Sequence, residues 1–173
     1  MGVTGLLILL QMLLINVRLA TSLPLPCDKS ILDTYIRSII DQEKAMNVPC
    51  QFSENVTLPQ PNLNAEWRRL QTSQQEADIQ RGFTLLLDSV PKVTTFISQC
   101  KLEVSLQKFS SNVRTLTNIL QKVNQQSETH ISEHEVRTLA VSTLQQFYTV
   151  YKNFLVGKYK TLIISLCKSL RHR

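Results

Sequence analysis

Apolar residues between positions 28 and 45 recur with the period of an α-helix. They mark one face of a helix from Asp28 to about Ala45, and they are Ile31, Leu32, Tyr35, Ile36, Ile39 and Ile40. The stretch from Pro49 to about Asn64 is polar and contains three prolines. We therefore expect a solvent-facing loop there.

A second helix is expected from Ala65 to Val90, where Pro91 ends the pattern. Its apolar residues are fewer, namely Trp67, Leu70, Ala77, Phe83 and the run Leu85 to Leu87. Gly82 lies in its interior, where glycine costs about 1 kcal/mol relative to alanine, so we expect a bend at this point. Residues 92–101 are then expected to form a connector that turns the chain.

The clearest periodicity belongs to the third helix. Its apolar residues step alternately by four and three positions, as in the seam of a helical bundle: Leu102, Leu106, Phe109, Val113, Leu116, Leu120 and Val123. A polar connector over 124–134 follows. The last helix is expected from Glu135 to about Leu166, with inward residues Leu139, Leu144, Phe147, Val150, Tyr151, Phe154, Leu155, Leu162, Ile163 and Leu166.

The lengths of the connections predict how the four helices are arranged. About 17 residues join the first helix to the second, which is enough to run the length of a bundle and leave these two helices parallel. The third connection, of about 11 residues, is shorter but can also cross over if the helix ends fray. Two crossovers predict an all-α, up-up-down-down four-helix bundle.

The first 22 residues have the features of a secretory signal peptide. Gly5 to Ile15 is an apolar run interrupted only by Gln11, and small residues follow at 20–22. The run has about ten residues, fewer than the roughly 20 that span a bilayer. We expect residues 1–22 to be removed and residues 23–173 to form one secreted domain without membrane insertion. An uncleaved membrane anchor is the alternative.

Composition fits a secreted helical protein. Apolar residues make up 43% of the 173 residues, aromatic residues only 6%, and there are four glycines, which argues against an all-β domain. Four cysteines, Cys27, Cys50, Cys100 and Cys167, predict two disulfides in an oxidising compartment, and the sequence alone permits three pairings. Asn55-Val56-Thr57 is an acceptor for N-glycosylation.

Charge and motifs narrow the possible chemistry. The net charge of +6 suits an acidic partner surface or a glycosaminoglycan as well as nucleic acid, but the basic and aromatic residues do not alternate as in nucleic-acid binders. His130-Ile-Ser-Glu133-His134 has the spacing of a zinc-protease motif, yet it lies in a polar connector. We expect no enzyme activity, no metal and no other cofactor.

Several ordered motifs resemble the erythropoietin/thrombopoietin family of long-chain helical cytokines along the whole mature chain. They are Cys27-Asp28 with Ile31-Leu32-x-x-Tyr35, Cys50-x-x-x-Glu54-Asn55-Val56-Thr57-x-Pro59, Trp67-Arg68-Arg69, Ser111-x-Val113-Arg114-x-Leu116-Thr117-x-x-Leu120, and Val150-Tyr151-x-Asn153-Phe154-Leu155-x-Gly157-Lys158 with Cys167 ten residues after the glycine. One departure is Val156, where the family carries arginine. Cys50 also lacks a near neighbour, which is similar to the thrombopoietin layout and implies the pairs Cys27–Cys167 and Cys50–Cys100.

The resemblance implies two receptor-binding faces. The high-affinity face is expected on the fourth helix and the first crossover, at Thr149, Asn153, Gly157, Lys158 and Asn64. The second face is expected on the first and third helices, at Ser30, Ile31, Thr34, Tyr35, Ser111, Arg114, Thr115 and Ile119. For Gly157, close helix packing and a smooth surface for a partner are equally good explanations.

The implied function is that of a secreted, monomeric hormone of the erythropoietin type. It is expected to bind two copies of a single-pass class I cytokine receptor, to activate Janus kinase/STAT signalling, and to promote survival, division and differentiation of red-cell progenitors. The alternatives are a thrombopoietin-like cytokine acting on the platelet lineage and a secreted helical carrier protein. A carrier needs a ligand chamber, whereas the inward positions are continuously large and apolar.

Overall fold

The computed structural model describes residue 27 and residues 29–45, 49–100, 106–124 and 136–171. Its elements are α2 (Lys29–Ala45), β1 (Gln51–Pro59), α3 (Ala65–Arg69), α4 (Thr72–Gln99), α5 (Gln107–Asn124), β2 (Thr138–Thr143), α6 (Leu144–Phe154), the π-helical turn η1 (Leu155–Tyr159) and α7 (Lys160–Arg171). The expected signal peptide and the His130–His134 motif lie outside the described residues.

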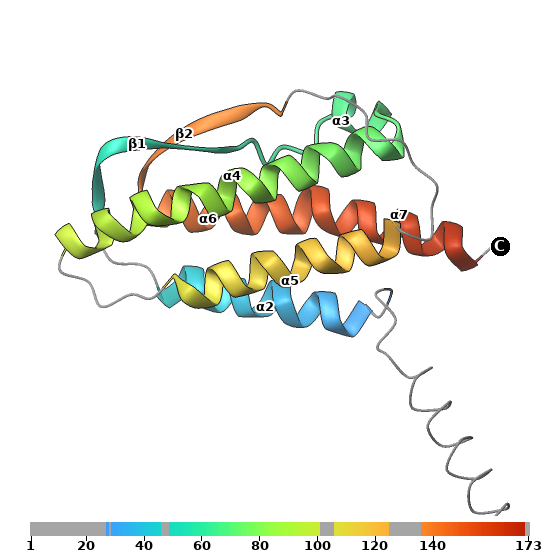
Figure 1. The fold of residues 1–173 in the computed structure, drawn as a ribbon, viewed down its shortest axis with the longest axis horizontal. Coiled ribbons are helices and arrows are strands. Elements are labelled where there is room, and N and C mark those ends of the chain that lie inside the picture. Colours follow the sequence, from blue (N-terminus) through green and yellow to red (C-terminus); the bar gives the residue numbers. More distant parts are fainter. Residues whose placement is uncertain (1–26, 28, 46–48, 101–105, 125–135, 172–173) are drawn as a thin grey trace, which may run out of the picture.

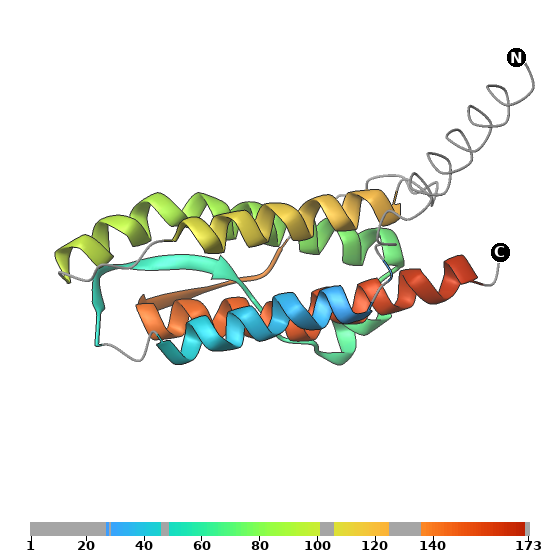
Figure 2. The same cartoon turned by 90° about the horizontal axis from the view of Figure 1, so that it is seen from below.

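Four long rods form a bundle, with α6, η1 and α7 joined into one continuous fourth rod (Figure 1). The rods α2 and α4 run in one direction, and α5 and the fourth rod run in the other (Figures 1 and 2). α2 packs against α6, α4 against α5, and α5 against α7. The predicted up-up-down-down four-helix bundle is therefore confirmed.

The two long connections pair with each other, which the sequence analysis did not predict. β1 and β2 are antiparallel, with Val56 opposite Val141 and Leu58 opposite Leu139, and the register shifts between Gln51 and Val56. Residues 51–59 of the expected loop are thus a strand, and the expected helix start near Glu135 is wrong, because residues 138–143 form β2. Phe52, Val56 and Leu58 are buried while their neighbours in β1 are mostly exposed, so the strand covers α4 with an apolar face.

The expected second helix is divided and extended. α3 is a separate five-residue helix, and α4 continues through Pro91 to Gln99, so the predicted end at Val90 and the connector over 92–101 are wrong. Proline in a helix interior loses one backbone hydrogen bond and costs about 3 kcal/mol. Here Pro91 is exposed, and the helix beyond it buries Val93, Phe96 and Ile97. Burial of three large side chains exceeds that cost.

The third and fourth rods keep their predicted inward faces. Leu106 and the later seam residues of α5 are buried, and Leu102 lies outside the described residues. The fourth rod begins at Leu144, where the Thr143 hydroxyl accepts a hydrogen bond from the Gln146 amide, and it ends at Arg171 instead of Leu166. Leu139 is consequently a strand residue and only partly buried.

Large aromatic side chains fill the centre of the bundle. The Phe109 ring lies 5.0 Å from that of Phe147 and 4.5 Å from that of Tyr151, both measured between centroids. The Tyr159 hydroxyl donates a 3.0 Å hydrogen bond to the Leu116 carbonyl, which satisfies its polar atom inside the core. Burial raises the pKa of Tyr148 to about 12, so this phenol stays neutral at physiological pH. The core is a packed interior.

Two disulfides hold the bundle together. Cys27 is joined to Cys167 and Cys50 to Cys100, which are the pairs that the resemblance implies. The first closes a loop across 140 residues and ties α2 to the end of the fourth rod; the second ties the start of the first crossover to the end of α4. In the chain-entropy model, loops of this size contribute about 4–5 kcal/mol each.

Gly82 allows α4 and the fourth rod to approach closely. A Cβ atom at this position would overlap the ring of Phe154, lying 2.9 Å from its Cε2. We expect Gly82→Ala to lower the free energy of unfolding by about 1–2 kcal/mol, because overpacking outweighs the gain in helix propensity. Urea unfolding measures this change. Gly157→Ala is the control, because its Cβ would lie 3.4 Å from the Pro61 oxygen and 3.8 Å from the Leu63 Cβ, both ordinary van der Waals contacts. An equal loss in both variants would contradict the packing role of Gly82.

Candidate binding surfaces

The first candidate surface combines the fourth rod with the crossover residues between β1 and α3. Asn153 is exposed on α6, and Gly157 is half-buried in η1. The Gly157 Cα faces the crossover backbone, because an added Cβ would lie 3.4 Å from the Pro61 oxygen and 3.8 Å from the Leu63 Cβ. Both distances are ordinary van der Waals contacts, so close helix packing does not account for a glycine at position 157.

Asn64 begins the short helix α3. Its Oδ1 accepts a 2.8 Å hydrogen bond from the Trp67 amide, which is the geometry of an N-cap. The side chain remains exposed. Asn64 thus places α3 at the end of the crossover, on the same side of the bundle as Gly157.

Thr149 is anchored to the first helix through Glu43. The Thr149 hydroxyl donates a 2.8 Å hydrogen bond to Glu43 Oε1, and Lys152 Nζ lies 2.6 Å from Glu43 Oε2. Burial raises the pKa of Glu43, but the hydrogen bonds from Lys152 and Thr149 and the charge of Lys152 outweigh it, so the net pKa is lowered. Glu43 and Lys152 thereby connect α2 to α6, and neither residue was predicted from the sequence.

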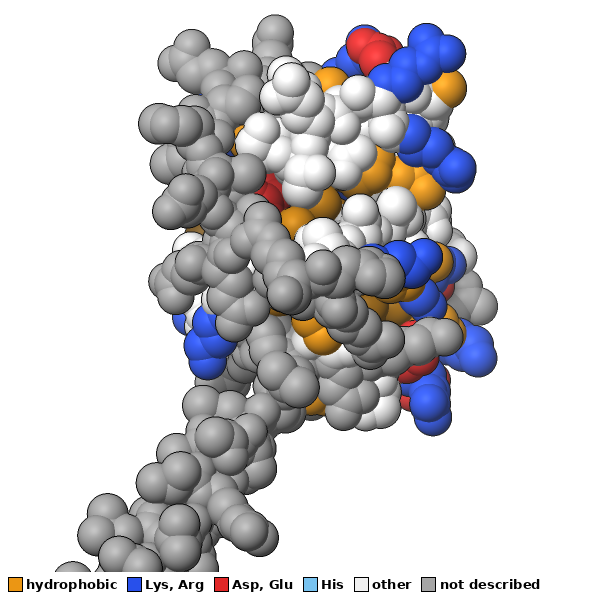
Figure 3. Space-filling model, turned by 90° about the vertical axis from the view of Figure 1, so that its right-hand side faces the viewer, with side chains coloured by type: hydrophobic (Ala, Val, Ile, Leu, Met, Phe, Trp, Pro, Cys, Tyr) orange, Lys and Arg blue, Asp and Glu red, His pale blue; other side chains and the backbone are white. Residues whose placement is uncertain are grey.

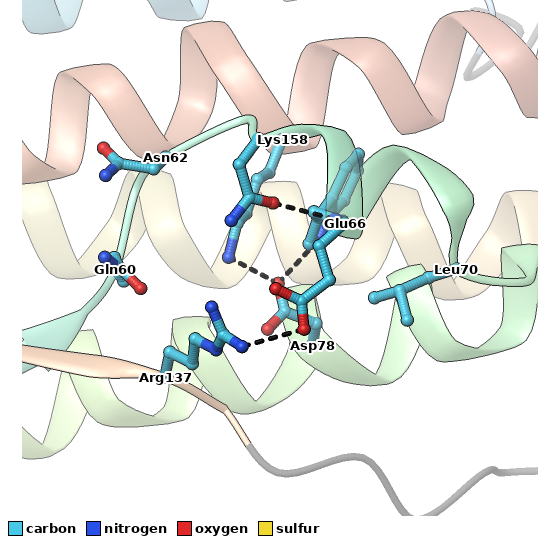
Figure 4. A pocket seen from close by; sticks show the side chains of 9 residues that line it. Gln60, Asn62, Glu66, Leu70, Asp78, Arg137 and Lys158 are labelled. Atoms are coloured by element: carbon cyan, nitrogen blue, oxygen red, sulfur yellow. Dashed lines mark hydrogen bonds and ion pairs between the residues drawn. The ribbon is translucent and has the colours of Figure 1, made fainter.

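Lys158 does not present its charge to solvent, contrary to its expected place on the high-affinity face. Its side chain is 5% exposed, and Nζ lies 2.8 Å from Oδ2 of Asp78, which is 2% exposed. The same oxygen accepts a 2.8 Å hydrogen bond from the Trp67 indole nitrogen. Figure 4 shows this buried cluster, and a second ion pair between Arg137 and Glu66 lies beside it. The reason is the helix phase, since Lys158 follows buried Phe154 by four residues.

A small pocket of about 40 Å³ adjoins the cluster of Trp67, Asp78 and Lys158. Its lining comes from the crossover, α3, α4, η1 and the residue before β2: Gln60, Asn62, Asn64, Glu66, Trp67, Leu70, Asp78, Arg137 and Lys158 (Figure 4). The sequence contained a signal for the cluster, because Lys158 and Asp78 are charged residues at inward positions of their helices. Pairing them required the tertiary structure.

The second candidate surface lies on α2 and α5, which face the same side of the bundle (Figure 2). Ser30, Thr34, Ser111 and Arg114 are exposed. Ile31, Tyr35, Thr115 and Ile119 are half-buried. The expected residues of each helix therefore reach the surface, and Arg114 is the charged residue among them.

A groove of about 470 Å³ lies along α2 within this second surface. It is lined by Thr34, Arg37, Ser38, Asp41, Gln42 and Ala45 of α2 and by Lys108 of α5. The hydroxyls of Thr34 and Thr115 donate to carbonyls of their own helices, at 2.8 and 2.9 Å. These two hydroxyls can therefore only accept from a partner, whereas Arg37, Asp41 and Lys108 place charged groups in the groove.

Positive charge gathers at the end of the molecule near α3 and the end of α7. Figure 3 shows Lys and Arg side chains along one side of this end, with acidic side chains beside them at the top and at the lower right of the view. Arg68, Arg69 and Lys168 are exposed basic residues of these helices.

Within the residues that the structure describes, no three His, Cys, Asp or Glu side chains gather as metal ligands, and no helix there is long and apolar enough to cross a bilayer.

Comparison with known proteins agrees with the motifs. The model of a family described as erythropoietin/thrombopoietin matches residues 24–170. The chain is 31% identical to erythropoietin of Equus caballus over 159 residues, covering 82% of this chain and 81% of the relative. It is 29% identical to erythropoietin of Felis catus over 95% and 94% of the two chains, and 29% identical to that of Oryctolagus cuniculus over 97% and 98%.

The ion pair at the first surface makes a prediction about pH. Because the pKa of Glu43 is lowered in the folded chain, its contribution to stability is present above the unfolded pKa and is lost as pH falls through the folded pKa. We expect Glu43→Gln to lower the free energy of unfolding by about 1 kcal/mol at pH 7 and by less near pH 3. Urea unfolding at both pH values measures this difference. A larger difference in unfolding free energy between wild type and Glu43→Gln at pH 3 than at pH 7 would contradict the stabilising role of the Glu43–Lys152 pair.

Proposed function

Because the chain belongs to the erythropoietin/thrombopoietin family of cytokine hormones, we propose that it is secreted and acts by holding two copies of a single-pass class I cytokine receptor together. Proteins of this family are not enzymes. The observation that carries the proposal is the division of the bundle into a core filled with large apolar side chains and two different outer surfaces. A packed core leaves recognition to the surface.

Secretion is supported by the sequence and by the cysteines. Residues 1–22 are proposed to be the signal peptide, and residues 23–173 the mature hormone. Two disulfides with no free cysteine among the described residues suit an oxidising, extracellular environment. Asn55 is exposed on β1, so its side chain is accessible for the proposed N-linked glycan.

The mechanism is one of geometry. The first surface, formed by α6, η1 and residues 61–64, is proposed to bind one receptor tightly, and the surface on α2 and α5 to bind a second copy more weakly. Each receptor carries a Janus kinase inside the cell, and holding the two kinases together starts STAT signalling. One monomeric hormone with two unlike surfaces is sufficient for this arrangement.

The proposed response is survival, division and differentiation of red-cell progenitors. It is supported by the relatives named erythropoietin, which match nearly the whole chain. The Cys50–Cys100 bridge is the observation that favours the alternative, a thrombopoietin-like hormone acting on the platelet lineage, because its layout is similar to that branch.

One experiment decides between these two lineages. Purified secreted protein is added to growth-factor-dependent cells that carry either the erythropoietin receptor or the thrombopoietin receptor. We expect proliferation and STAT phosphorylation only in cells with the erythropoietin receptor. A response restricted to the thrombopoietin receptor would establish the alternative, and no response in either line would contradict the proposed function.

Arg114 tests the second surface. Its side chain is exposed on α5, so charge reversal in Arg114→Glu is expected to leave the fold and the tight binding of one receptor unchanged while lowering signalling at least about tenfold. Single-receptor affinity by surface plasmon resonance and STAT phosphorylation in cells measure the two effects. Lys122→Glu is the matched control, since it lies about 12 Å further along the same helix. Loss of both activities in Arg114→Glu would contradict two separate surfaces.

A further inference from the structure

Two neighbouring residues of η1, Gly157 and Lys158, face different parts of the molecule. Gly157 is half-buried and faces the crossover, because a Cβ added there would lie 3.4 Å from the Pro61 carbonyl oxygen and 3.8 Å from the Leu63 Cβ. Lys158 points inward and reaches Asp78 on α4, 2.8 Å away. A single turn of the fourth rod therefore faces the crossover and is linked, through Asp78, to the helix α3 at its end.

The cluster of Trp67, Asp78 and Lys158 depends on all three of its members. Asp78 Oδ2 receives both the Lys158 ammonium and the Trp67 indole N–H. Lys158 Nζ also lies 5.9 Å from the ring centroid of Trp67 and 5.7 Å from that of Phe154, within the range of cation–π attraction. Removing one charge leaves the other buried and unpaired, which is strongly unfavourable. The cluster is complete only when α3 occupies its observed place.

α3 needs such support because it has only five residues. Isolated helices of that length are unstable in water, so contacts with the rest of the protein must hold it in place. Besides the indole hydrogen bond, the Gln75 amide donates to the Trp67 carbonyl at 3.1 Å, and Arg137 pairs with Glu66 at 2.8 Å. The Arg137–Glu66 pair is mostly exposed and contributes little. The buried cluster is the strongest of these attachments.

We propose that Lys158 is a positioning residue: with Asp78 and Trp67 it fixes residues 60–69 against η1, so that the first receptor-binding surface is preformed before the receptor arrives. The inference rests on the proposed function, because it assigns a role to Lys158 within that surface. The receptor then binds a conformation that most hormone molecules already have. The apparent affinity of the hormone for the receptor is therefore not lowered, as it would be if only a small fraction of the molecules had the binding-competent conformation. Lys158 itself makes no contact with the receptor.

The test uses full-length secreted protein and a soluble erythropoietin-receptor ectodomain. Lys158→Met keeps the length of the side chain and removes its charge, which leaves Asp78 unpaired. We expect the affinity for the single ectodomain to fall at least about tenfold, while maximal signalling at saturating hormone is retained. Lys92→Met is the matched control, since it breaks an exposed ion pair with Glu54 elsewhere on the same crossover.

A double variant distinguishes positioning from direct contact. In Asp78→Asn/Lys158→Met, the asparagine still accepts from the Trp67 indole, and no charge is left buried without a partner. We expect this variant to recover affinity to within about threefold of the wild type. If Lys158 contacted the receptor itself, the double variant would bind as weakly as Lys158→Met, and that result overturns the proposal.

Trp67 reports on the cluster without any receptor, because it is the only tryptophan in the chain. In Lys158→Met we expect its fluorescence to shift to longer wavelength and hydrogen exchange over residues 60–69 to accelerate. Unchanged signals together with weakened binding would overturn the proposal, as would changed signals with unchanged binding. If Lys158→Met is not secreted, Asp78→Asn is measured in its place, with the same expectations.

The same experiments separate failure of this inference from failure of the proposed function. Wild-type protein that binds no receptor ectodomain contradicts the proposed function, and with it the binding role of Lys158. In that case the fluorescence and hydrogen-exchange results still decide whether the cluster fixes residues 60–69. Tight wild-type binding with no effect of any cluster variant contradicts the inference alone.

Discussion

Burial of the fourth rod against all of its neighbours is the constraint on which the rest of the structure depends. It meets α2 through the Lys152–Glu43 pair and the Cys27–Cys167 disulfide. It meets α4 where Gly82 admits the ring of Phe154, and α5 where the Tyr159 hydroxyl binds the Leu116 carbonyl. Because each contact lies at a different height, the rod sets both the spacing and the register of the bundle. Both proposed surfaces inherit their geometry from it.

The paired crossovers follow from the up-up-down-down topology. Two parallel neighbours in sequence require a connection as long as the bundle, and this topology contains two such connections. Running side by side in opposite directions, β1 and β2 satisfy each other's backbone hydrogen bonds and place Val56 and Val141 on the apolar surface of the helices. The ribbon also fixes where the first crossover ends. Residues 60–69 therefore reach η1 from a defined direction.

The periodic pattern of apolar residues predicted the helices and their buried faces. The seam of α5 and the inward face of the fourth rod were visible in the sequence because one periodic stripe suffices to bury a helix. The β-ribbon was not visible, because its two strands are far apart in sequence and no local pattern specifies that they pair. The helix end predicted at Pro91 was wrong for a related reason. Proline disfavours a helix locally, but the helix continues because tertiary packing buries Val93 and Phe96. Among the site residues, the exposed position of Arg114 was predictable, whereas the partner of Lys158 was not.

The buried ion pair of Lys158 and Asp78 is explained better by specificity than by stability. Two apolar side chains of similar size would often stabilise a core equally well or better, because removing charges from water is costly. An apolar pair, however, would accept Trp67 in many orientations, whereas Asp78 Oδ2 accepts its indole N–H in one direction only. The proposed receptor-binding surface, assembled from a short helix, a crossover and a helical turn, needs that directionality. The charges therefore define the position of α3, and the apolar core around them supplies the stability.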